Sequence, residues 1–198
     1  MKIALPLLTA TMLAGCAATP VAANPQDAFF AALSARCGQA YAGTLASDQE
    51  ADAEMRGKAM VMHIRHCTAD RIEIPFHIDG LGPDGSWDRS RTWIITRTST
   101  GLRLKHDHRH ADGSADAVTL YGGDTAEAGS TTRQSFPVDA ESIAMFTATG
   151  HRVSNTNIWS VETTADGFTY GLNREGRHFR VTFDYDRPVE LPPAPWGW

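Results

Sequence analysis

Along most of the chain, hydrophobic and polar residues alternate with a period of two, which is the period of a β-strand. The clearest case is residues 71–78, where Ile72, Ile74, Phe76 and Ile78 alternate with Arg, Glu, Pro and His. This alternation predicts a strand with one face buried and the other in water. Turn residues separate this segment from others of the same kind. The predicted strands are 41–46, 58–66, 71–78, 91–98, 102–110, 116–122, 132–136, 156–163, 167–173 and 177–185.

Two segments depart from this alternation and have the features of helices. Asn24 can cap a helix and Pro25 suits its first position, so a helix is predicted over Pro25–Cys37. Its apolar residues fall on one stripe, so the helix should lie on the main body or plug it. Residues 138–147 are predicted to form one short helix that Asp139 caps.

This order of elements indicates a mainly β fold. About ten short strands, joined mostly by hairpins, favour a single antiparallel barrel or sandwich, and closure into a lipocalin-like barrel would remove exposed strand edges. The chain does not alternate strands with helices, which argues against a parallel α/β fold. We therefore expect one β-rich domain over residues 25–198, with the N-terminal helix and the short helix near 138–147 as additions.

The stretch GLRLKHDHRHADGS, residues 101–114, carries histidines at alternate positions. Alternation on a strand puts His106, His108 and His110 on one face, together with two leucines that precede them. Arginines, Lys105 and an aspartate occupy the other face. The histidines are therefore expected to point toward the interior or a mouth of the barrel.

A tight hairpin at Ser99-Thr100 would set the partners of these histidines. In that register His106 lies opposite Trp93, and His108 lies opposite Arg91. The apolar residues of the two strands then share one face, which favours this register over a slip of one residue.

This arrangement suggests a site for a small organic ligand. Arginine and histidine side chains beside a tryptophan suit a carboxylate or phosphate group, and histidine would make the binding pH-sensitive. The residues predicted to bind the ligand are Arg91, Trp93, Arg97, His106 and His108.

A metal site is the alternative interpretation of the histidines. A His-x-His pair on a strand directs both imidazoles to one side, about 7 Å apart at the backbone. Neutral imidazole suits a divalent transition metal such as zinc, copper or nickel. The candidate ligands are His106, His108, His110 and Asp112. Neighbouring Arg and Lys side chains would repel a divalent cation, and neither the metallo-β-lactamase pattern nor the cupin pattern fits these residues.

The N-terminus has the features of an export signal. Residues 1–15 contain one basic residue and an apolar run that is too short to span a bilayer. The sequence LAGC at 13–16 resembles the lipobox of bacterial lipoproteins. The resemblance implies cleavage before Cys16, acylation of that cysteine, a lipidated tether at 16–24 and, because Ala17 follows, attachment to the outer membrane facing the periplasm. An ordinary secretory signal is the alternative.

Removal of Cys16 from the count leaves an even pair of cysteines, Cys37 and Cys67. In an oxidising compartment such a pair predicts a disulfide. The formal net charge is −5. An acidic chain of this kind argues against a nucleic-acid partner and against electrostatic adhesion to anionic lipid, so the acyl anchor would hold the protein at the membrane.

The run RSRTWIITRTSTGLRLKHDHRHADGSADAVTLYGGDT, residues 89–125, resembles the core of a group of uncharacterised bacterial secreted proteins and lipoproteins. The resemblance implies a compartment and a single domain, but no reaction. No GxSxG motif or phosphate-binding glycine loop is present, so the sequence gives no support for catalysis. A binding module is the leading hypothesis, followed by a metal-binding protein or metal-dependent enzyme. The third is a structural envelope lipoprotein that docks on another protein, whose identity the sequence does not indicate.

Overall fold

The computed structural model describes residues 24–198 and contains one antiparallel sheet that closes into a nearly complete barrel. The predicted signal at 1–15, the lipid attachment at Cys16 and most of the predicted tether lie outside the described residues. The elements in chain order are α1 (Pro25–Ser34), β1 (Ala40–Leu45), η1 (Glu50–Met55), β2 (Met60–His63), β3 (His66–Cys67), β4 (Arg71–Ile78), η2 (Pro83–Gly85), β5 (Asp88–Arg97), β6 (Leu102–His108), β7 (Tyr121–Asp124), β8 (Arg133–Pro137), α2 (Ala140–Ala148), η3 (Arg152–Thr156), β9 (Ile158–Thr163), β10 (Gly167–Arg174) and β11 (Arg177–Val189).

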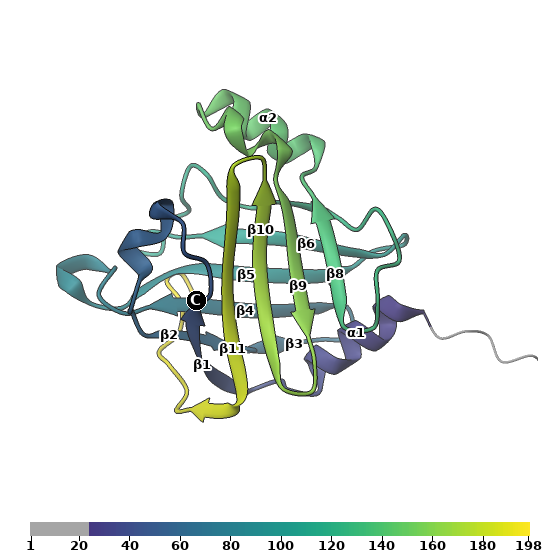
Figure 1. Ribbon diagram of the computed structural model, residues 1–198, viewed down its shortest axis with the longest axis horizontal. Helices are drawn as coiled ribbons and strands as arrows, with labels where there is room; N and C mark the ends of the chain where they lie inside the picture. Colours follow the sequence, from purple (N-terminus) through teal and green to yellow (C-terminus); the bar gives the residue numbers. More distant parts are fainter. Residues whose placement is uncertain (1–23) are drawn as a thin grey trace, which may run out of the picture.

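The strand order is β7-β6-β5-β4-β2-β1-β11-β10-β9-β8, with β3 paired to β4 outside this path. Figure 1 shows β8 to β11 as a front layer that crosses β4, β5 and β6 behind it. The helix α2 covers one end of the barrel, and α1 lies toward the opposite end. The mainly β barrel and the two helices that the sequence predicted are therefore confirmed.

Aromatic and aliphatic side chains from both layers fill the space between them. The alternating residues of β4 face this interior, and Ile72, Ile74 and Ile78 have no exposed surface. The sequence predicted a wet outer face for this strand, but Glu73 and His77 on that face are also buried. Glu73 forms an ion pair with Arg71 at 2.6 Å, and His77 lies in a pocket whose lining includes the C-terminal segment.

The first and last turns of α1 follow from its sequence. The side chain of Asn24 accepts a hydrogen bond from the backbone N–H of Gln26 at 3.0 Å, which is the predicted cap. The helix ends at Ser34, three residues before the predicted end, and continues as turns to a glycine with φ of 82° at position 38. Phe29, Phe30 and Leu33 are buried, so α1 packs its apolar stripe against the barrel as expected.

The predicted disulfide is present between Cys37 and Cys67. It joins the segment after α1 to β3, and the two residues are 30 positions apart in the chain. Closing a loop of this length stabilises a fold by about 3–4 kcal/mol in the loop-entropy model.

The β5–β6 hairpin has the predicted register. Trp93 lies opposite His106, and Arg91 lies opposite His108. The segment that follows does not match: a strand was expected over 116–122, but β7 begins only at Tyr121. Leu120 adopts a positive φ of 55°, which interrupts an extended strand at that point.

The barrel closes between β7 and β8 through close backbone contacts. A Cβ atom added at Gly123 would lie 1.7 Å from the carbonyl oxygen of Pro137, so only glycine permits this approach. The hydroxyl of Ser142 accepts a hydrogen bond from the N–H of Gly122 at 2.8 Å. These contacts fasten α2 to the edge of the sheet, and Asp139 caps α2 as predicted by accepting a bond from the Ser142 N–H.

Candidate functional site

A cavity of about 280 Å³ opens at the end of the barrel that α2 covers. Its walls come from the interior faces of both layers, and its rim comes from η1, α2, η3 and the turn between β10 and β11. The residues that line it are Met55, Phe76, Arg91, Trp93, His106, His108, Val118, Tyr121, Phe146, His151, Ser154, Asn157, Trp159, Tyr170, Leu172, Arg174, Arg177 and Phe179.

Stacked aromatic rings form the deep wall of the cavity. The ring of Trp93 lies between those of Phe76 and Tyr170, with ring centroids 5.0 Å and 4.4 Å away. Both pairs are nearly parallel, at 14° and 17°. Because stacking covers the faces of Trp93, the wall offers ring edges against which an apolar ligand can pack.

His106 is held in this wall by both of its ring nitrogens. Nδ1 lies 3.0 Å from the carbonyl oxygen of Tyr121, and Nε2 lies 2.7 Å from the hydroxyl of Tyr170. Because a carbonyl only accepts, Nδ1 must carry the hydrogen, and Nε2 accepts from the tyrosine. Burial lowers the pKa of His106 to about 3. The imidazole is therefore neutral at physiological pH.

His108 lies nearer to the rim and is also partnered. Its Nε2 is 2.9 Å from the hydroxyl of Tyr121. Burial, and then the positive charge of Arg91, lower its pKa to about 4. Neither histidine therefore changes charge near neutral pH, and the pH-sensitive binding expected from the sequence does not arise from these two groups.

Three arginines line the cavity, and two of them are paired with buried carboxylates. Arg91 forms an ion pair with Asp88, and Arg177 forms one with Asp52. The pKa of Asp52, which burial alone would raise, is held below its usual value by hydrogen bonds from Arg177 and a serine. The two ion pairs fix the positions of their guanidinium groups at the cavity wall.

Arg174 is the third arginine of the cavity, and it makes no ion pair within residues 24–198. One terminal nitrogen donates to Oδ1 of Asn157 at 3.2 Å. Its Nε is buried and has no hydrogen-bond partner in the described part of the chain. Burial, and then the neighbouring Arg177, lower the pKa of Arg174 from its usual value.

The structure brings four of the five predicted ligand-binding residues together. Arg91, Trp93, His106 and His108 all line the cavity, but Arg97 does not. Arg97 lies six residues beyond Arg91 along β5, or roughly 20 Å, and pairs with Asp27 near the other end of the barrel. Position on the same strand face was thus not sufficient to place it in the site.

The residues of the metal hypothesis are not brought to one point. His106 and His108 face the cavity, whereas His110 and Asp112 lie exposed on the following turn. The carboxylate of Asp112 accepts hydrogen bonds from the backbone and hydroxyl of Ser114. Across residues 24–198, no three His, Cys, Asp or Glu side chains are grouped closely enough to hold one ion.

Sequence reasoning did not find Arg174, Arg177, Tyr170, Tyr121 or Trp159. One local signal for the first two exists. Residues Phe168, Tyr170, Leu172 and Arg174 alternate on β10, and the turn at 174–177, between two predicted strands, has an arginine at each end. The inward-facing residues of β5 also pass from an aromatic residue, Trp93, to an arginine, Arg91. Only the closed barrel shows that the inward faces of β5 and β10 converge.

No protein-family model matches the chain, and neither a curated protein nor a solved structure matches it. The described helices are all too short or too polar to cross a membrane. The cavity and its side chains therefore carry the functional argument alone.

Proposed function

We propose that this chain is a lipid-anchored protein of the bacterial envelope, and that its barrel binds a small organic ligand in the cavity beneath α2. The observation that carries the binding proposal is the cavity itself. A space of about 280 Å³, with an aromatic wall and a few polar groups at its rim, has the composition typical of small-molecule sites. The hydrogen-bonded histidine and the stacked tryptophan hold that wall in place before any ligand arrives.

Binding can be tested with benzoate, phenyl phosphate and the neutral benzamide, measured by calorimetry on residues 24–198. At least one of the three should bind the wild type, with a dissociation constant on the order of 1 mM, given the small number of atoms. Leu172→Trp should abolish binding because the larger side chain fills the cavity that Leu172 lines. Val153→Trp, at an exposed position on η3 outside the cavity, should bind as the wild type does.

The binding proposal fails if none of the three probes binds the wild type, or if Leu172→Trp binds the probe as tightly as Val153→Trp does. Circular dichroism of both variants establishes beforehand that each retains the folded barrel.

The anchor proposal rests on the LAGC sequence at 13–16 and requires its own experiment. The full-length protein should incorporate radiolabelled palmitate in bacteria and fractionate with the outer membrane. Cys16→Ser should lose both the label and the membrane association, because it removes the thiol that would be acylated. Equal labelling of Cys16→Ser and wild type, or no labelling of either, would refute the anchor and leave the cavity argument untouched.

A further inference from the structure

The charged side chains that line the cavity are all positive. Within residues 24–198, Arg91, Arg174 and Arg177 line it, and no aspartate or glutamate does. Two acids that pair with these arginines, Asp52 and Asp88, do not line the cavity and are already engaged by Arg177 and Arg91. Among the described residues, the lining therefore offers a ligand cations, neutral polar groups and aromatic rings, but no carboxylate.

We propose that the ligand of this cavity is an organic anion with a planar apolar body, and that Arg174 is the main anchor of its charged group. This inference rests on the proposed binding function and specifies its ligand. A carboxylate or a phosphate ester supplies the acceptor oxygens that a guanidinium binds through two parallel N–H groups. The planar body would pack against the ring edges of Trp93 and Tyr170, since these two rings stack on each other.

Arg174 differs from its two neighbours in the state of its hydrogen bonds. Arg91 and Arg177 each use some of their N–H groups to bind a carboxylate. Within the described residues, the side chain of Arg174 donates only to the neutral side chain of Asn157. Its buried Nε has no acceptor within residues 24–198. A buried donor without an acceptor is costly, and an oxygen of an anionic ligand would satisfy it.

The surroundings of Arg174 also favour a negative charge. Arg177, on the other side of the turn, is close enough to disfavour the charged form of Arg174. An anion between the two guanidinium groups would reduce their mutual repulsion. The rim adds neutral donors, the hydroxyl of Ser154 and the amide of Asn157, from the segment that follows α2.

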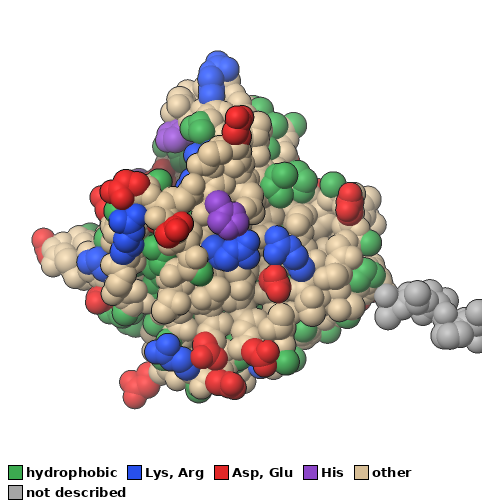
Figure 2. All heavy atoms as spheres, viewed as in Figure 1, with side chains coloured by type: hydrophobic (Ala, Val, Ile, Leu, Met, Phe, Trp, Pro, Cys, Tyr) green, Lys and Arg blue, Asp and Glu red, His purple; other side chains and the backbone are tan. Residues whose placement is uncertain are grey.

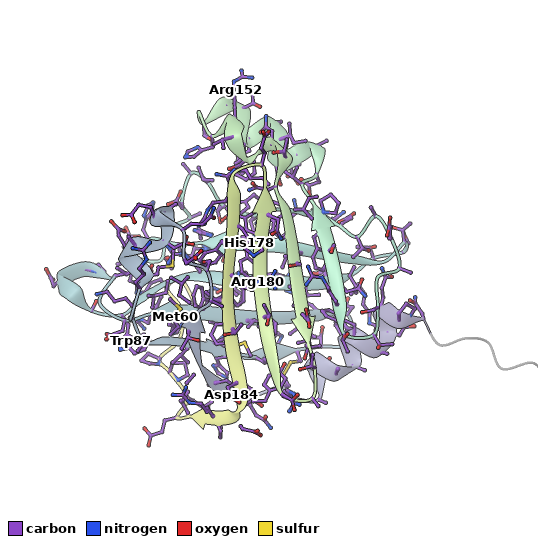
Figure 3. The ribbon with its side chains drawn as sticks, in the orientation of Figure 1. Met60, Trp87, Arg152, His178, Arg180 and Asp184 are labelled. Carbon is purple, nitrogen blue, oxygen red and sulfur yellow. A yellow bond between two sulfur atoms is a disulfide. The ribbon has the colours of Figure 1, made fainter. Side chains whose placement is uncertain are left out.

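Arg180, which Figure 3 labels, is a matched control for Arg174 because it lies on the same β10–β11 hairpin. Arg180 and His178 lie on β11 on the outer side of the barrel, and neither lines the cavity. Figure 2 shows basic side chains and a histidine at the centre of this outer face. Substitution of Arg180 removes the same charge from the same strand pair without touching the cavity.

The test compares benzoate, phenyl phosphate and benzamide by calorimetry at constant ionic strength, in wild type, Arg174→Gln, Arg174→Lys and Arg180→Gln. Wild type should bind benzoate or phenyl phosphate at least tenfold more tightly than benzamide. Arg174→Gln should weaken binding of that anion by roughly 10- to 100-fold and leave benzamide unchanged. Arg174→Lys should recover part of the loss, since it restores charge but not the planar fork. Arg180→Gln should match the wild type.

The anion arms distinguish the two ligand types that share this chemistry. Tighter binding of benzoate identifies a carboxylate, and tighter binding of phenyl phosphate identifies a phosphate ester; either supports the proposal. If benzamide binds the wild type as tightly as both anions, or if Arg174→Gln weakens the anions no more than Arg180→Gln, the anion assignment is wrong and the binding function stands. If none of the three binds, both proposals fail.

Discussion

Acidification from about pH 7 to about pH 5 is expected to lower the free energy of unfolding by roughly 2 kcal/mol for each of three histidines whose pKa is strongly lowered. The three are His77, His106 and His108, whose pKa values in the folded protein are lowered to about 4, 3 and 4. Between those values and the ordinary histidine pKa, the unfolded chain binds protons that the folded protein does not. The histidine contribution is therefore complete above about pH 6.5 and is lost as the pH falls toward 4.

Burial is the largest cause of all three shifts, and cations add to it. Lys105 acts on His106, Arg91 acts on His108, and Arg89 acts on His77, while the hydrogen bond to the Tyr121 carbonyl partly opposes the shift of His106. Buried carboxylates with lowered pKa values, such as Asp88, contribute their own acid loss below the histidine range. Acid lability between about pH 6.5 and 4 therefore reports on the histidines.

Urea denaturation at several pH values measures this dependence. His106→Gln retains groups that can bond to Tyr121 and Tyr170 but has no ionisable ring, so its stability should fall less steeply with acid. His110→Gln, at an exposed position, should show the same pH dependence as the wild type. A wild-type stability that does not change between about pH 7 and 5 would contradict the buried, neutral state of these histidines.

Removal of either partner of the Asp52–Arg177 ion pair should destabilise the fold by about 3–5 kcal/mol, because a charge is left unpaired in a buried position. The side chain of Asp52 has no exposed surface, and that of Arg177 is 15% exposed. The pair ties η1 to the start of β11 at the rim of the cavity. Arg177→Met is the sharper of the two substitutions, since it leaves the carboxylate in place without its cation.

A double-mutant cycle measures the coupling within this pair. The double variant Asp52→Asn/Arg177→Met should be destabilised by less than the sum of the two single variants, because no lone charge remains. The half-exposed pair of Arg133 and Glu162 provides the comparison, and Arg133→Met should cost less than about 1 kcal/mol. Additive effects of the two single substitutions would show that Asp52 and Arg177 do not stabilise each other.

The local parts of the fold could be predicted from the sequence, because they depend on neighbouring residues. The register that places Trp93 opposite His106 follows from a tight turn and from apolar residues on one face of both strands. The disulfide follows from the even cysteine count once Cys16 is assigned to the anchor. The predicted start of this strand, at residue 116, was wrong. The local sequence does not indicate that Leu120 adopts a positive φ, because the residues around it alternate as in a strand.

The site could be predicted only in part, because half of it comes from the opposite layer of the barrel. Arg91 and His108 were placed correctly by their hairpin. Arg174 and Tyr170 both belong to β10, which is far from β5 in the sequence. No local pattern indicates which strands will face each other. The same limit explains Arg97, which shares a strand face with Arg91 but lies near the other end of the barrel.

The chain contains five tryptophans, and their indole signals in a nitrogen-15 NMR spectrum test the binding account most directly. Trp93 and Trp159 line the cavity, whereas Trp87, Trp196 and Trp198 do not. In separate titrations with benzoate, phenyl phosphate and benzamide, the account predicts that at least one probe gives saturable shifts of the Trp93 and Trp159 signals, with the other three unchanged. Shifts confined to the other three tryptophans, or no shift at any of the five with any probe, would contradict it.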